Sequence, residues 1–266
     1  MGRVLIIAGS DSGGGAGVQA DIKTVTALGG YAATAITAIT VQNTLGVTGV
    51  HGVPADIVAR QIEAVLSDIG ADCIKTGMLG DAATIAVVAD CLEAVGGDIP
   101  LVLDPVMVAK GGAALLEDAA IAALASRLLP RARLVTPNLP EAARLAGFPV
   151  EGEEAMIAAG RALLEKGAGA ALVKGGHGAG DEVVDILITR QGPRRFAGPR
   201  LVSRHTHGTG CTLASAIAVG LAEGHALEDA VARARRYVMR AIATAPGYGQ
   251  GHGPLNHGFP CDGSMS

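Results

Sequence analysis

Aromatic side chains are nearly missing from this sequence, which has no tryptophan and only three tyrosines and three phenylalanines among 266 residues. So few rings leave almost no material for the stacking surfaces and aromatic cages that bind nucleobases or quaternary ammonium groups. Positive charge is scarce as well: the formal net charge is −4, and no long run of lysine or arginine occurs. We therefore predict that neither nucleic acid nor a membrane surface is a partner of this chain.

Paired cysteines and long apolar segments are also missing. The four cysteines lie far apart and form no C-x-x-C pair, which disfavours a zinc site or a disulfide framework: Cys73, Cys91, Cys211 and Cys261. The first apolar run, residues 3–8, is too short for the core of a signal peptide. No uninterrupted apolar stretch reaches the roughly 18–20 residues of a membrane helix. These absences predict a soluble, cytoplasmic protein.

Short β-branched runs alternate along the chain with longer segments of helical period, such as residues 55–69, where Val58, Ile62 and Val65 fall on one face. The predicted strands are residues 4–8, 32–41, 73–75, 101–103, 134–136, 170–174, 183–189 and 195–199. The predicted helices are residues 18–28, 55–69, 82–95, 117–128, 153–166, 209–223 and 227–243. This alternation predicts an α/β fold of three layers, with a mostly parallel central sheet and helices on both faces.

Two segments depart from that alternation. Residues 183–199 read as a hairpin with its turn at residues 191–194. The Gly- and Pro-rich tail from about residue 246 reads as irregular. No linker, repeat or charge block marks a boundary, so we predict that residues 1–266 form a single domain.

Two familiar nucleotide motifs fit poorly. Residues 15–20 match the dinucleotide pattern G-x-G-x-x-A, but six residues separate them from the first strand, and no acid ends the next one. A Walker A loop is missing, because Lys23-Thr24 and Lys75-Thr76 each follow isoleucine rather than glycine. If this protein handles phosphates, it uses another device.

The run His207-Gly-Thr-Gly-Cys-Thr-Leu-Ala214 supplies such a device. A glycine-rich turn that leads into a helix directs free backbone N–H groups and the positive helix end at one point, where an oxyanion fits. An ordinary helix start with Thr209 as its cap explains the spacing equally well. Cys211 lies in the first helical turn, where N–H donors lower a thiol pKa, although a lone cysteine is usually a small buried hydrophobe.

Several longer strings span nearly the whole chain: residues 8–21, 41–44, 75–79, 104–112, 136–141, 173–177, 207–212 and 251–257. In this order they resemble the hydroxymethylpyrimidine/phosphomethylpyrimidine kinase family of thiamine biosynthesis, within the ribokinase-like class. One departure is His205, where the resemblance leads us to expect asparagine. The resemblance implies a ribokinase-like fold and a kinase that uses ATP and Mg²⁺.

The resemblance also assigns roles to single residues. It implies an anion hole and catalytic group formed by Gly208, Thr209, Gly210 and Cys211, with the cysteine in place of the aspartate base of most ribokinase-like enzymes. The thiol would deprotonate or orient the substrate hydroxymethyl group, and as a thiolate only if its pKa approaches neutrality. The implied pyrimidine site consists of Gln42, Asp21, Gly9, Ala16, Met78 and Val106.

The remaining implied residues serve ATP. Lys174, Asn138, Glu141 and Thr206 would bind its phosphates, and Asp104 and Glu141 would hold Mg²⁺ through water. Structural alternatives stay open at this stage: Gln42 as a strand-end cap, Asp21 as a solvated helix residue, and Lys174 as a snorkelling strand-end side chain.

We therefore expect ATP-dependent phosphorylation of 4-amino-5-hydroxymethyl-2-methylpyrimidine and of its monophosphate. The alternatives are a pyridoxine/pyridoxal kinase and, less favoured, a catalytically silent ligand-binding homologue. A homodimer is the default assembly for such an enzyme. Glycines at residues 111–114 and 177–181 suggest a lid over the substrate.

Overall fold

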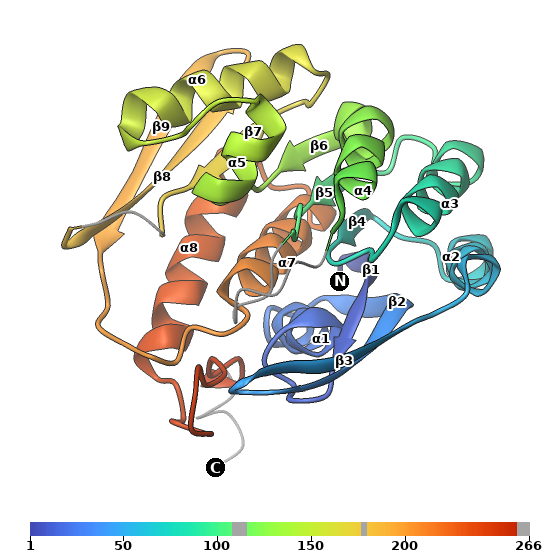
Figure 1. The fold of residues 1–266 in the computed structure, drawn as a ribbon, viewed down its shortest axis with the longest axis horizontal. Coiled ribbons are helices and arrows are strands. Elements are labelled where there is room, and N and C mark those ends of the chain that lie inside the picture. The colour runs from blue at the N-terminus through green and yellow to red at the C-terminus, as the bar shows by residue number, and fades with distance from the viewer. Residues whose placement is uncertain (108–115, 177–179, 260–266) are drawn as a thin grey trace.

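The computed structural model describes residues 1–107, 116–176 and 180–259. Within this part of the chain, nine strands form one sheet in the order β3-β2-β1-β4-β5-β6-β7-β8-β9 (Figure 1). The strands are β1 (Arg3–Asp11), β2 (Tyr31–Asn43), β3 (Gly46–Gly52), β4 (Cys73–Thr76), β5 (Leu101–Leu103), β6 (Ala132–Val135), β7 (Ala171–Lys174), β8 (Glu182–Thr189) and β9 (Gly192–Pro199). The six strands from β2 to β7 in this order run parallel, whereas β3, β8 and β9 pair in antiparallel fashion.

Helices cover both faces of the sheet (Figure 1). They are α1 (Gly17–Ala27), α2 (Ala55–Asp68), α3 (Ala82–Ala94), α4 (Asp118–Ala123), α5 (Leu139–Ala146), α6 (Gly152–Glu165), α7 (Thr209–Ala222) and α8 (Leu227–Ala243). The segment after α4 continues as a π-helical turn, Leu124–Leu128, and a 3-10 turn, Leu129–Arg131. Among the described helices, none combines the length and apolar character needed to cross a membrane.

Successive side chains of β1 point to opposite faces of the sheet and so contact the two layers of helices in turn. Val4 and Ile6 pack with α1, α7 and α8, whereas Leu5 and Ile7 pack with α2, α3 and α4 on the opposite face. Both sets are almost completely buried, because a strand covered on both sides needs apolar residues at every position. A smaller cluster joins α5 and α6 to β7 and β8. The predicted three-layer α/β fold is confirmed.

The order of the parallel strands creates a ligand-binding edge. From β1 the chain passes through α1 to β2 on one side, and later crosses to β4 on the other side of β1. At such a switch point the connecting helices lie on opposite faces, so a crevice opens beyond the carboxyl ends of the strands. The ends of β1, β4, β5, β6 and β7 all meet at this edge.

Sequence reasoning missed two elements and misplaced a turn. Strand β3 was not predicted, because its run Gly46-Val-Thr-Gly-Val-His-Gly52 is rich in glycine and largely exposed. Helix α5 was not predicted because it has only eight residues. The β8–β9 hairpin is present, but its turn lies at residues 190–191, since Thr189 pairs with Gly192. The predicted lid segment 111–114 and most of segment 177–181 lie outside the described residues.

Candidate active site

A cavity of about 1100 Å³ occupies the carboxyl edge of the sheet. Its wall brings together residues that are far apart in the sequence, from the end of β1 to the first turn of α7 and the side of α8. Most of the predicted site residues line this cavity: Gly9, Ala16, Gln42, Met78, Asp104, Val106, Asn138, Glu141, Lys174, Thr206, Gly208, Thr209, Gly210 and Cys211. Asp21 is the predicted residue that does not.

The turn before α7 can adopt its shape only with glycine. Gly208 has φ +82°, and a Cβ added there would lie 1.8 Å from the carbonyl oxygen of Gly15. Thr209 stabilises the turn, because its hydroxyl donates to the carbonyl of Thr206 over 2.7 Å. The first N–H groups of a helix have no acceptor within the helix, so this turn directs those of Gly210 and Cys211 into the cavity.

A lysine and a carboxylate lie against that turn. The Nζ atom of Lys174, at the end of β7, is 3.2 Å from Oδ1 of Asp104, which follows β5. A Cβ added to Gly210 would lie 3.3 Å from this Nζ and 3.7 Å from Oδ2 of Asp104. Burial alone lowers the pKa of Lys174, but Asp104 and Glu141 outweigh it, so the pKa stays above its ordinary value. A permanent positive charge therefore stands beside the free N–H groups.

Asn138 and Glu141 form the capping box of α5. The Asn138 side chain accepts from the N–H of Glu141, and the Glu141 carboxylate accepts from the N–H of Asn138, each over 2.9 Å. Burial and the nearby Asp104 raise the pKa of Glu141, and Lys174 opposes them. The pattern Asn138-Leu-Pro-Glu141 is therefore first a helix start. The Glu141 carboxylate accepts from the backbone N–H of Met107 as well.

Cys211 does not have the lowered pKa that its place at a helix start suggests. Burial is the dominant effect and raises its pKa to about 11, although Lys75 and the N–H of Gly17 act in the opposite direction. The condition for Cys211 to act as a thiolate, a pKa near neutrality, is therefore not met, since desolvation of the thiolate outweighs the helix end. At neutral pH the group is a thiol, which can donate a hydrogen bond but carries no charge.

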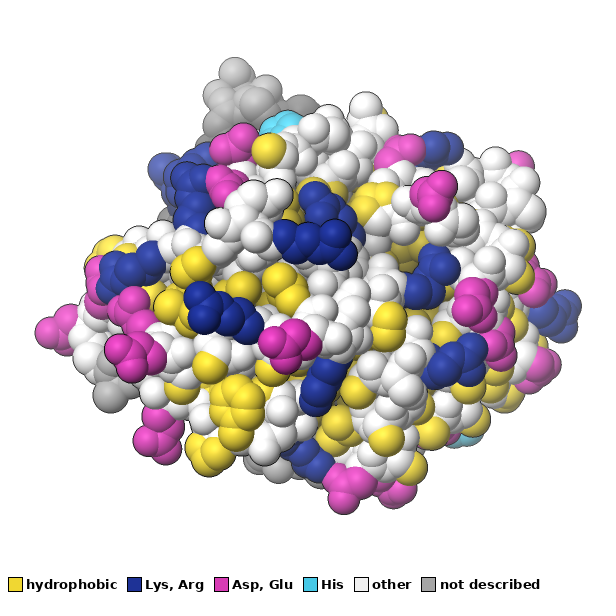
Figure 2. Space-filling view, turned by 90° about the horizontal axis from the view of Figure 1, so that it is seen from above, with side chains coloured by type: hydrophobic (Ala, Val, Ile, Leu, Met, Phe, Trp, Pro, Cys, Tyr) yellow, Lys and Arg dark blue, Asp and Glu magenta, His cyan; other side chains and the backbone are white. Residues whose placement is uncertain are grey.

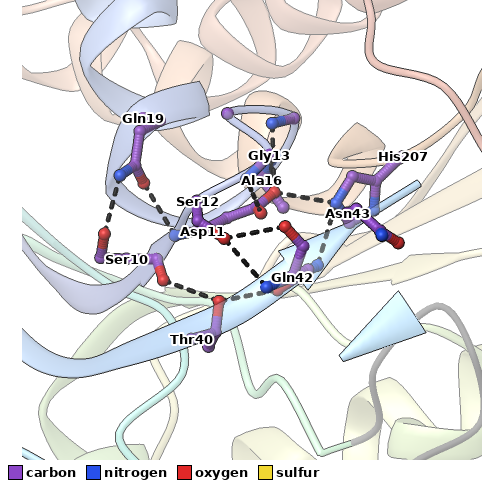
Figure 3. Close-up of polar contacts among 12 residues, drawn as sticks. Ser10, Asp11, Ser12, Gly13, Ala16, Gln19, Thr40, Gln42, Asn43 and His207 are labelled. Carbon is purple, nitrogen blue, oxygen red and sulfur yellow. Dashed lines mark hydrogen bonds and ion pairs between the residues drawn. The ribbon is translucent and has the colours of Figure 1, made fainter. Parts of the chain in front are cut away.

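The glycine-rich loop after β1 holds an anion, but that anion belongs to the chain itself (Figure 3). The Asp11 carboxylate accepts from the N–H groups of Gly13, Gly15 and Ala16 over 2.8–3.1 Å. It also lies 3.0 Å from Nε2 of His207. Burial raises the pKa of Asp11, but these hydrogen bonds outweigh burial and hold it below its ordinary value. Three N–H groups that a dinucleotide phosphate would need are therefore already bound to Asp11.

Gln42 reaches the cavity because β2 is irregular at that point. The pairing of β2 with β3 shifts between Val41 and Gln42, so that Val41 opposite Gly49 is followed by Gln42 opposite Val47. An irregularity of this kind redirects a side chain, here toward the cavity wall. The Gln42 amide then lies between Thr40 and His207, 3.1 Å from each (Figure 3).

Asp21 lies in a different place from the one predicted. Its side chain is 0 % exposed, and its carboxylate accepts from Nζ of Lys75 and from the Ser215 hydroxyl. Asp21 does not line the cavity, and its carboxylate oxygens are bound to Lys75 and Ser215, so the predicted contact between Asp21 and a pyrimidine ring is corrected. It is Lys75, also buried, that lines the cavity next to Cys211 and Asp104.

Small side chains give the cavity its room. A Cβ added to Gly9 would lie 2.4 Å from the methyl carbon of Met78, so glycine is needed for Met78 to extend across the end of β1. Ala16 precedes α1, and Val106 follows β5 beside Asp104. These residues would contact the faces of a flat ring, whereas Gln42 would contact its edge.

Sequence reasoning missed three residues of this region: Asp11, Lys75 and the side chain of His207. A charged residue inside an apolar strand, such as Lys75 in Cys-Ile-Lys-Thr, signals a buried partner. Asp11 stands directly before a glycine-rich turn, where a carboxylate commonly accepts from backbone N–H groups. Neither signal says which distant residue completes the pair.

The fold is a mostly parallel sheet with a switch point, and the site combines a glycine turn at a helix start with a lysine beside it. These features are those of a kinase of the ribokinase-like class. Comparisons with known proteins narrow the class to one family. The family model "Phosphomethylpyrimidine kinase" matches residues 11–256. A hydroxymethylpyrimidine/phosphomethylpyrimidine kinase of Rhizobium meliloti is 50 % identical over 95 % of this chain and 96 % of its own length. The chain belongs to the phosphomethylpyrimidine kinase family and is a phosphotransferase.

A second relative is larger. The thiamine biosynthesis bifunctional protein ThiED of Geobacter sulfurreducens is 54 % identical over 96 % of this chain, which spans 52 % of that protein. Among solved structures, the phosphomethylpyrimidine kinase of Clostridium difficile has a TM-score of 0.81 and 39 % identity, covering 91 % of this chain and all of its own. The pyridoxal kinase of Staphylococcus aureus with AMP-PCP and pyridoxal has a TM-score of 0.89 and 36 % identity, covering 97 % and 94 %.

Proposed function

We propose that this chain transfers the γ-phosphoryl group of ATP to the hydroxymethyl oxygen of 4-amino-5-hydroxymethyl-2-methylpyrimidine, and then to the phosphate of the resulting monophosphate, in thiamine biosynthesis. One observation carries the proposal: the α7 turn, Lys174 and Asp104 lie together in the same cavity as Gln42. Phosphoryl transfer needs chiefly positioning and charge stabilisation, which these groups supply.

The ATP phosphates would lie against the α7 turn. The N–H groups of Gly210 and Cys211 and the Lys174 ammonium would stabilise the charge on the transferred phosphoryl group. Thr206, which lines the cavity and accepts from Thr209, would border the same phosphates. Beyond it, an apolar wall of the cavity offers room for the adenine: Val183, Leu201, Val238, Met239 and Ile242.

Mg²⁺ fits this site as a partner of the phosphates. Asp104 and Glu141 both line the cavity, and their mutual repulsion contributes to the raised pKa of Glu141. Among the described residues, no group of three His, Cys, Asp or Glu side chains could hold a metal ion. Phosphate oxygens and water would therefore complete its coordination, as Mg²⁺ favours. Bound there, the ion would neutralise phosphate charge.

Cys211 would orient the acceptor hydroxyl as a neutral thiol rather than remove its proton as a thiolate. A pKa of about 11 leaves almost no thiolate at pH 7. A largely dissociative transition state places little demand on a base at an early stage. The reaction then depends on where the hydroxyl oxygen is held relative to the phosphoryl group.

Pyridoxal kinase activity is the second candidate. The structural neighbour from Staphylococcus aureus, at a TM-score of 0.89, is a pyridoxal kinase solved with AMP-PCP and pyridoxal. Pyridoxal has a flat ring and a hydroxymethyl arm, so a cavity built for one acceptor has the approximate shape for the other.

The test is ADP release by the wild type, Cys211→Ser and Cys211→Ala with the pyrimidine, its monophosphate and pyridoxal. We expect turnover of both pyrimidines, a loss of about 10²-fold in Cys211→Ala, and a smaller loss in Cys211→Ser, whose hydroxyl keeps a donor. A tenfold preference for pyridoxal would contradict the substrate assignment. Equal activity of all three proteins would contradict the role of Cys211. We also expect a homodimer in the cytoplasm.

A further inference from the structure

The amide of Gln42 lies in a network whose hydrogens can be counted. As drawn in Figure 3, the amide nitrogen of Gln42 is 3.1 Å from Nε2 of His207, and the amide oxygen is 3.1 Å from Oγ1 of Thr40. The oxygen and nitrogen of a carboxamide exchange places by a half-turn of the side chain, with almost no change in shape. The partners therefore decide which orientation the molecule adopts.

Asp11 fixes the proton of His207. Its carboxylate is ionised at neutral pH, because three backbone N–H groups and the imidazole stabilise the charge. An ionised carboxylate can only accept, so Nε2 of His207, 3.0 Å away, must carry a hydrogen. An N–H at this position cannot accept from an amide nitrogen. The end of Gln42 that faces His207 must therefore be the oxygen.

Thr40 accommodates the same orientation from the other side. Its one hydroxyl hydrogen has two acceptors within reach, the carbonyl of Ser10 at 2.9 Å and the facing end of Gln42 at 3.1 Å. When the hydrogen goes to Ser10, Oγ1 has lone pairs to offer Gln42 and accepts from the amide nitrogen. His207 thus selects an amide turned by half from the one drawn in Figure 3, and Thr40 gives the turned nitrogen an acceptor.

The imidazole itself is held rigidly. A Cβ added to Gly15 would lie 2.6 Å from Cδ2 of His207 and 3.3 Å from Pro254, so the ring packs closely against the loop and the C-terminal segment. The backbone N–H of His207 donates to the carbonyl of Gly253. The side chain is nearly buried. Its ring can therefore serve as a fixed reference for its neighbour.

We propose that the Asp11–His207 pair is a specificity device, which locks the Gln42 amide with its oxygen toward His207 and so selects an aminopyrimidine over pyridoxal. The inference rests on the proposed function and adds positioning residues to it. In the locked orientation Gln42 keeps one unused lone pair on Oε1 and one unused hydrogen on Nε2. It thus offers the substrate one acceptor and one donor.

The two acceptors differ in the pattern they show to that amide. With their hydroxymethyl arms superposed, the pyrimidine presents an amino group and then a ring nitrogen, a donor beside an acceptor. Pyridoxal presents an aldehyde oxygen and then a phenolic oxygen, so a group that can only accept takes the place of the donating amino group. A locked amide pairs fully with the first pattern and only through its N–H with the second. If the amide turns, the pyrimidine loses more than pyridoxal does.

The experiment compares kcat/KM for the two acceptors in the wild type, Asp11→Asn and His207→Phe. In Asp11→Asn the side-chain amide can donate to Nε2 of His207, so this nitrogen no longer has to carry a hydrogen. In His207→Phe the partner of the Gln42 amide is removed. We expect the pyrimidine-to-pyridoxal ratio to fall about tenfold in both, the worth of about one hydrogen bond, mainly through a higher KM for the pyrimidine. A purely structural defect would lower both kcat/KM values together and leave the ratio unchanged. His51→Gln, an exposed histidine on β3, is the matched control.

Nitrogen-15 NMR of the histidine rings gives a second readout, with the His207 signals identified by their loss in His207→Phe. We expect a hydrogen on Nε2 of His207 in the wild type at pH 7. An active wild type whose ratio survives both substitutions, or whose His207 has only Nδ1 protonated, overturns this inference and leaves the kinase assignment intact. A wild type that releases no ADP with any acceptor overturns both.

Discussion

The buried pair of Lys75 and Asp21 allows a quantitative prediction. Both side chains are 0 % exposed, and Nζ lies 2.9 and 3.0 Å from the two carboxylate oxygens. Burial alone lowers the pKa of Lys75, but the Asp21 carboxylate outweighs it and keeps the pKa above its ordinary value. The pair is therefore ionic. The hydroxyl of Ser215 donates to the same carboxylate over 2.7 Å.

Removing one partner leaves the other charge buried without compensation. We expect Asp21→Asn or Lys75→Met alone to lower the free energy of unfolding by about 3–5 kcal/mol. In a chain of this size that corresponds to a fall of roughly 6–15 °C in Tm. The triple variant Asp21→Leu/Lys75→Met/Ser215→Ala, which also removes the orphaned hydroxyl, should recover most of the loss. Apolar groups of similar volume need no compensation.

Urea unfolding followed by circular dichroism measures these differences. The matched control is Asp90→Asn, which breaks an exposed pair with Arg127 and should leave the unfolding midpoint almost unchanged. Single substitutions at the buried pair that cost less than about 1 kcal/mol would refute the reasoning. So would a triple variant whose loss of unfolding free energy is as large as the sum of the losses in Asp21→Asn and Lys75→Met.

Two further predictions concern the α7 turn and pH. Gly208 and Gly224 both have positive φ, but a Cβ at Gly208 would meet the Gly15 carbonyl at 1.8 Å, whereas at Gly224 it would meet nothing within 4 Å. Gly224→Ala should lower the free energy of unfolding by about 1 kcal/mol, and Gly208→Ala by at least about 3 kcal/mol. Equal losses in the two variants would contradict the clash between a side chain at position 208 and the Gly15 carbonyl. Burial lowers the pKa of His257 to about 4, so the unfolded chain binds a proton first as the pH falls from about 6.5, and stability is lost between there and pH 4. The free energy of unfolding of the wild type should fall by about 3 kcal/mol more than that of His257→Gln over this pH range. Identical pH profiles of the two proteins would refute the lowered pKa of His257.

Local sequence patterns determined much of the fold. The apolar period of residues 55–69 was sufficient to predict α2, and the β-branched run at the start of the chain was sufficient to predict β1. A helix or strand that packs on a neighbour needs apolar residues at its own period, whatever that neighbour is. The positive φ that Gly208 needs is likewise a local property. Strand β3 escaped prediction, since its glycine-rich run is stabilised by pairing with β2 and not by its own composition.

Candidate site residues were harder to interpret, because their environments are set by distant parts of the chain. The sequence places Cys211 at a helix start, which lowers a thiol pKa, and Asp21 within an exposed-looking helix. Packing of α1 against α7 buries Asp21 completely and Cys211 partly. Desolvation therefore raises the pKa of Cys211 to about 11, and Asp21 pairs with Lys75, 54 residues away. The effect of solvent exclusion exceeds that of the helix end.

The sequence by itself determined the alternation of strands and helices, the glycine turn before α7 and the family, because these depend on residues that are neighbours along the chain. The tertiary structure alone decided which groups share a charge or a proton: Asp11 with His207, Asp21 with Lys75, and Asp104 with Lys174. Each of these pairs joins residues between 54 and 196 positions apart. Electrostatic interactions depend on distance and burial in three dimensions, and neither quantity is a property of a local sequence pattern.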